Sequence, residues 1–137
     1  MGLRDSIVTR MLADSTLMAL LTGSVHAATE ISRQNTPTAF DANAELKPCA
    51  LVKVSGDVAS GPYARSARTS IEIYFYQRVG YDTIEAARLR TMTLLHQTKI
   101  DSHVWGLEWS DEVSEQVDDT LQCSLGMSRY MATRSIQ

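Results

Sequence analysis

The chain has 137 residues, of which 44% are hydrophobic and 21% are charged, and its formal net charge is −3. This length and composition predict one globular domain with its own core, spanning residues 1–137. The small negative charge argues against a general nucleic-acid binder, because such proteins usually carry a clear basic excess. No apolar run approaches the ~20 residues of a membrane-spanning helix, so we expect no membrane contact.

The N-terminal quarter is expected to be helical. Residues 2–13 place apolar side chains on one broad side of a helix, and the stretch Asp14-Ser15-Thr16 then offers an N-cap for a second helix. Gly23 suits the left-handed position at the end of that helix. Residues 25–31 have the character of a short strand, and residues 32–47 have no consistent period and are expected to form a long loop or arm.

The centre of the chain alternates as a half-buried strand does. After an apolar strand at residues 49–55 and a Gly- and Pro-punctuated hairpin connection, residues 68–77 (RTSIEIYFYQ) alternate strictly between two sides. One side is apolar and is expected to face the core: Thr69, Ile71, Ile73 and Phe75. The other side is expected to face outward: Ser70, Glu72, Tyr74 and Tyr76.

A helix is predicted over residues 82–97. Asp82 and Glu85 have the spacing of an acidic capping box at its start. Its apolar stripe contains Ile84, Ala87, Thr91, Leu94 and Leu95. Arg88 lies at the edge of this stripe, so its stem is expected to pack there while the guanidinium reaches a carboxylate, in the same chain or across a subunit boundary.

The C-terminal part is expected to be a strand hairpin. Residues 104–109 have strand character, and a regular strand would place Trp105 and Trp109 on one face, either over the core or as an anchor between subunits. Residues 110–120 are acidic and predict a loop, and residues 121–131 alternate as a final strand. The predicted fold class is α+β, an antiparallel sheet of about four to five strands packed against one long helix, with an N-terminal helical segment.

Acidic residues are concentrated in one region. Between Ile100 and Ser128 there are seven acids and no Lys or Arg. Five of them form a run without the spacing of a calcium-binding loop: Asp111, Glu112, Glu115, Asp118 and Asp119. This run is expected to be a solvated loop, the lining of a channel, or a face for a basic partner.

The chain carries no recognisable catalytic signature. His96 and His103 flank the end of the long helix without a nucleophile or triad motif, and no second His or Cys follows His26 at metal-ligand spacing. Cys49 and Cys123 lie in apparent strands and are expected to behave as small buried hydrophobes, with a disulfide between them possible only if their Cα atoms come within about 7 Å. We therefore expect no enzyme, no catalytic residue, no metal and no cofactor.

Three segments in order resemble a known family. An N-terminal helix with residues 17–23 (LMALLTG), a strand with residues 47–54 (KPCALVKV), and the strand-to-helix unit at residues 68–97 look like the small tail completion, or tail terminator, proteins of long-tailed bacteriophages. The resemblance covers roughly residues 15–97 and consists of pattern more than of invariant residues.

The resemblance implies a structural virion protein of the phage neck, assembled in the host cytoplasm. Such a protein closes into a hexameric ring, caps the tail tube, and contacts the tube protein and a head-completion or connector protein. DNA passes through the ring without specific binding. No catalytic role transfers, and the residues expected at the subunit boundary are Glu72, Tyr74, Tyr76 and Arg88. The alternative is a small ligand- or nucleic-acid-binding α+β module.

Overall fold

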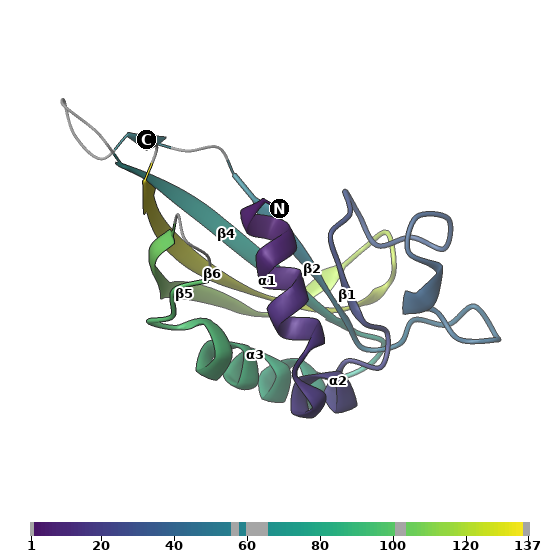
Figure 1. The fold of residues 1–137 in the computed structure, drawn as a ribbon. Coiled ribbons are helices and arrows are strands. Elements are labelled where there is room, and N and C mark those ends of the chain that lie inside the picture. The colour runs from purple at the N-terminus through teal and green to yellow at the C-terminus, as the bar shows by residue number, and fades with distance from the viewer. Residues whose placement is uncertain (1, 56–57, 60–65, 101–103, 136–137) are drawn as a thin grey trace.

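The protein is a mixed β-sheet with its three α-helices packed on one side, shown in Figure 1 as a computed structural model that describes residues 2–55, 58–59, 66–100 and 104–135. The helices are α1 (Leu3–Leu12), α2 (Ser15–Leu20), η1 (Pro37–Ala39, a short 3-10 helix) and α3 (Asp82–Leu95). The strands are β1 (Val25–His26), β2 (Cys49–Val54), β3 (Val58–Ala59), β4 (Ser66–Gln77), β5 (Val104–Asp118) and β6 (Cys123–Ser135).

The sheet has the strand order β1-β2-β4-β6-β5, and β3 pairs with the start of β4. All pairs are antiparallel except β1 with β2, which is parallel. The predicted α+β class is confirmed, including the N-terminal helical segment and the pairing of the last two strands. In place of the predicted strand at residues 25–31, only Val25 and His26 form β1.

Strand β4 has the predicted two faces. Thr69, Ile71, Ile73 and Phe75 are all buried beneath the helices. Figure 1 shows α1 lying over β2, where it also contacts β1, with α2 beside α3. We call the helix-covered side of the sheet its inner face and the opposite side its outer face.

The second helix begins as predicted, at an Asp14 cap. The Asp14 carboxylate accepts a hydrogen bond from the backbone N–H of Leu17 at 2.8 Å and forms a bidentate pair with Arg90 on α3 at 2.9 and 2.7 Å. The Arg90 hydrogen bond is the main reason that the pKa of Asp14 falls to about 2. One side chain therefore caps α2 and ties it to α3.

The predicted capping box at Asp82 and Glu85 is wrong. Tyr81 is the N-cap residue and makes no side-chain cap bond. The side chain of Gln77, at the end of β4, caps the helix instead. Its Oε1 accepts hydrogen bonds from the backbone N–H groups of Thr83 and Ile84, and its Nε2 donates to Asp82 Oδ1. Because Asp82 already lies inside the helix, a residue from the preceding strand is better placed to cap it.

The predicted left-handed conformation of Gly23 is also wrong. Ser24 has the positive φ of 73° at this turn. Gly23 is needed for close approach instead, since a Cβ there would lie 2.9 Å from the carbonyl oxygen of Pro48. Its N–H donates to that same oxygen at 2.7 Å, which holds the end of the helical segment against the start of β2.

Residues 110–118 are strand and not the predicted loop. Strand β5 runs to Asp118, and its register with β6 shifts between Val104 and Gly106, between Trp109 and Asp111, and between Val113 and Gln116. Such bulges break the period of two, so alternation along the sequence is lost. Trp105 falls at the first shift and its side chain lies outside the described residues, so parity with Trp109 is not informative; Trp109 packs against the inner core.

Residues 32–47 are not a free arm. They fold back onto one end of the outer face, where Ile31, Ala39, Phe40 and Leu46 form a cluster with Cys49, Leu51, Tyr76 and Cys123. Ala39, Phe40 and Leu46 come from this segment, and their burial could not be predicted because the segment has no regular apolar period. Of the predicted connection at 56–66, β3 pairs with β4 as a hairpin requires, while residues 56–57 and 60–65 lie outside the described residues.

Cys49 and Cys123 are buried free thiols, as predicted. They lie on β2 and β6, on either side of β4, so a disulfide would have to cross two strand spacings of about 4.8 Å, beyond the ~7 Å Cα limit. Burial raises the pKa of each thiol to about 12.

We expect both thiols to be nearly inert in the folded protein. Raising the pKa from 9.0 to about 12 lowers the thiolate fraction at pH 8 about a thousand-fold. A thiol-exchange reagent should modify neither residue before unfolding and should titrate both in denaturant. Fast modification of either Cys in the native state would contradict this burial.

Gly126 sets the distance between α3 and the sheet. A Cβ there would lie 2.7 Å from Ile84 Cγ2, whereas a Cβ at Gly106 would meet nothing within 4 Å. We expect Gly126→Ala to lower the free energy of unfolding by about 1–3 kcal/mol through overpacking, and Gly106→Ala to have little effect. Denaturant titration measures both, and the double variant with Ile84→Val should recover part of the loss. Equal effects of the two glycine substitutions would refute the close approach.

Candidate functional site

The outer face carries a row of charges that crosses four strands. The strand register places side by side Lys53 of β2, Glu72 of β4, Arg129 of β6 and Asp111 of β5. Their signs alternate. Arg129 Nη2 lies 3.3 Å from Glu72 Oε2, and Arg129 Nη1 lies 2.9 Å from Asp111 Oδ2. The two carboxylates, Glu72 first, raise the pKa of Arg129, so this cation is neutralised within its own chain.

Tyr74 extends this row toward the covered end of the face. Its ring lies 5.6 Å from Lys53 Nζ, a cation–π contact, and the side chain is half-buried. Burial, followed by the neighbouring Glu72 carboxylate, raises its pKa. Glu72 and Tyr74 thus lie where the alternation predicted, on a face that a neighbour can reach.

Tyr76 was predicted to face solvent, and this prediction is wrong. It shares the outer face, but its side chain is only 6% exposed because residues 31–46 cover that end of the sheet. Burial raises its pKa above the ordinary value, with Asp118 as the next cause. In this fold Tyr76 belongs to a core cluster, and it is not available to a partner.

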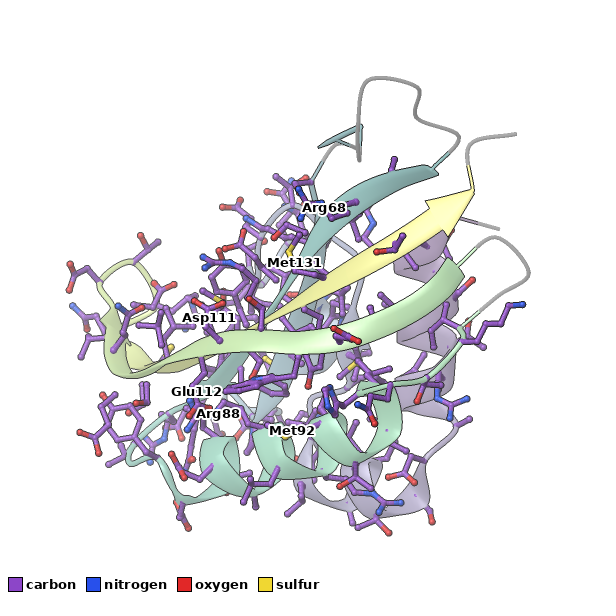
Figure 2. All side chains as sticks on the ribbon, turned by 90° about the vertical axis from the view of Figure 1, so that its left-hand side faces the viewer. Arg68, Arg88, Met92, Asp111, Glu112 and Met131 are labelled. Carbon is purple, nitrogen blue, oxygen red and sulfur yellow. The ribbon has the colours of Figure 1, made fainter. Side chains whose placement is uncertain are left out.

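Arg88 has the predicted position and finds its carboxylates within the chain. It is 5% exposed, forms an ion pair with Glu85 one turn earlier, and places Nη1 3.2 Å from Glu112 Oε2 of β5. Figure 2 shows Arg88 and Glu112 facing each other between α3 and β5. Its Nε and Nη1 have no hydrogen-bond partner among the described residues, so the contact of Nη1 with Glu112 is an ion pair without a hydrogen bond. Arg88 therefore anchors α3 to β5 inside the subunit.

The acidic run divides between different environments. Asp111 joins the outer charge row, while Glu112 faces inward to Arg88. Asp118 accepts the N–H of Leu121 at 2.8 Å and so shapes the turn. Glu115 and Asp119 are exposed and have no ion pair within the described part of the chain. The five predicted acids do not form one surface.

The histidines that the structure describes have structural partners. His96 Nδ1 accepts the backbone N–H of Trp109 at 2.9 Å, which fastens the end of α3 to β5, and His26 Nε2 lies 2.7 Å from the carbonyl oxygen of Gly23. His103 lies outside the described residues. Within residues that are described, no group of three or more His, Cys, Asp or Glu is placed to hold a metal, and no helix is long and apolar enough to cross a membrane.

The outer face also has a groove that the sequence did not predict. It has a volume of about 320 Å³ and lies where β4, β5 and β6 meet, lined by Arg68, Gly106, Glu108, Met131 and Thr133. Arg68 alternates in step with Glu72 along β4, so the sequence alone could have placed it on the outer face. The shift in register near Trp105 hid the contribution of Gly106 and Glu108. We call this feature the outer groove.

Comparison with known proteins identifies a shared fold but does not assign the chain to a family. No family model matches the chain, and no curated protein matches its sequence. Among solved structures, a chain in the virion of a native gene transfer agent particle superposes with a TM-score of 0.70 at 17% identity, covering 98% of this chain and 95% of that one. At this identity the likeness shows that the two chains share their fold over almost their whole length.

Proposed function

We propose that this protein is a structural component of a phage-like virion, and more specifically a ring-forming tail terminator of the neck. The observation that carries the proposal is the end-to-end likeness in fold to a chain of a gene transfer agent virion. It agrees with the resemblance of residues 15–97 to tail completion proteins. Under this proposal the protein is not an enzyme and acts through its surfaces.

A ring requires two different surfaces on each subunit, because a patch on one copy meets another patch on the next. The half-exposed outer face with Glu72 and Tyr74 is one candidate for such a contact. The exposed acids Glu115 and Asp119 are candidates for a contact or for a channel lining that does not hold DNA phosphates. We assign the ends of the ring to a tail tube protein and to a head-completion or connector protein.

The oligomeric state tests this proposal. Native mass spectrometry at micromolar and higher concentrations should show closed particles, near 91 kDa for a hexamer of the 15.2 kDa chain. Electron microscopy should show rings, and added rings should arrest a growing tail tube. A monomer at every concentration and with tube protein present would overturn the proposal.

Tyr74 and Tyr76 offer a matched pair of substitutions. Tyr76→Ala removes a buried ring and should cost about 3–5 kcal/mol of unfolding free energy. Tyr74→Ala should cost less stability but should weaken assembly, since its half-exposed ring lies on the open outer face. Thermal unfolding and sedimentation separate the two effects. Unchanged assembly in a folded Tyr74→Ala variant would remove this part of the face from the subunit boundary.

A further inference from the structure

The two ends of the β5–β6 hairpin carry features that the subunit itself does not use. At one end, just before the turn to β6, lies the last part of β5 with the residue that follows it, residues 115–119, which we call the hairpin tip. At the other end is the outer groove. Between Gly106 and Val117 the strand advances 11 residues, or about 36 Å, so the two features are far apart in one copy.

The hairpin tip presents an apolar side chain between acids. Val117 is 63% exposed, which is unusual for a large aliphatic residue in this chain. Glu115 and Asp119 flank it, and both are exposed without an ion pair in the described residues. Glu115 also has a positive φ of 54° at the shift in register between Val113 and Gln116, after which β5 pairs with β6 again through Asp118.

The outer groove presents the complementary chemistry. Arg68 is exposed and has no ion pair among the described residues, and Met131 is half-buried beside it. Figure 2 shows Arg68 and Met131 on the side of the sheet away from α1. Gly106 leaves the β5 wall open, because a Cβ there would meet no atom within 4 Å. Glu108 is the one acid that lines the groove.

We propose that the hairpin tip of one copy docks in the outer groove of the next copy, with Val117 on Met131 and the tip acids beside Arg68. This inference rests on the proposed ring and names its contact. The occupant is a second copy because the tip matches the groove in both charge and apolarity. Since tip and groove lie at opposite ends of the hairpin, repeated docking is head-to-tail, which generates a ring when the rotation closes.

Charge reversal with mixing tests the contact. Arg68→Glu should repel the native tip, and Glu115→Lys with Asp119→Lys should repel the native groove, so each variant alone should lose about tenfold or more in association. An equimolar mixture should assemble again, because each altered tip then meets an altered groove and each native tip a native groove. Arg4→Glu, at an exposed residue of α1, is the matched control and should assemble normally.

Two further substitutions check the apolar and acidic parts of the contact. Val117→Ser should weaken assembly, whereas Leu89→Ser, at an equally exposed residue of α3, should not. Glu108→Gln should strengthen assembly, because it removes the acid that repels the tip. Thermal unfolding of each variant confirms that the subunit stays folded.

The outcomes separate this inference from the proposed function. If the native protein forms rings but mixing restores nothing, the contact is wrong and the ring stands. If mixing restores only dimers, the contact is supported and the ring is overturned. If the native protein never associates, both are overturned.

Discussion

The structure depends on covering the inner face of β4. This strand pairs with β2, β3 and β6, so its backbone is satisfied along both edges and its buried side chains must be covered by helices. Each large apolar side chain buried there contributes about 1.5–3 kcal/mol. Helix α3 comes close enough only because Gly126, opposite Phe75, has no side chain to meet Ile84. The glycine on β6 therefore determines where the helix lies and which of its residues reach the sheet.

That close approach has an electrostatic consequence. It carries Arg88 beneath β5, where losing water costs several kcal/mol unless the charge is paired. Glu85 precedes it by one turn and Glu112 projects inward from β5, so the cation has two carboxylates, although neither Nε nor Nη1 has a hydrogen bond among the described residues. Such a pair adds little net stability compared with apolar packing. It does favour one orientation of α3 relative to β5, since a rotated helix would bury the charge alone.

Sequence reasoning succeeded where a pattern is local and regular. The alternation of β4, the stripe of α3 and the Asp14 cap need only neighbouring residues, and all three are observed. It failed where a distant residue decides. Gln77 replaces the expected cap, bulges erase the period of β5, and residues 31–46 bury Tyr76. The outer groove belongs to this second class, because it requires three strands and a shift in register that no single segment reveals.

The acidic run lies on β5, which is an edge strand of the sheet, and this position explains its charge. Residues 96–98 cover β5 near Leu107, but along residues 110–118 the strand has no outer strand partner within the described chain. An unpaired edge invites indiscriminate pairing, and charges with bulges oppose it. Asp111 and Glu112 are held on opposite faces by ion pairs with Arg129 and Arg88. They place charge along the edge strand, but both are already paired within the chain. The tip beyond them has exposed acids without an ion pair in the described part of the chain, and an exposed aliphatic side chain, Val117. Under the contact proposed above, the end of this protected edge is the place where a neighbour of complementary charge binds.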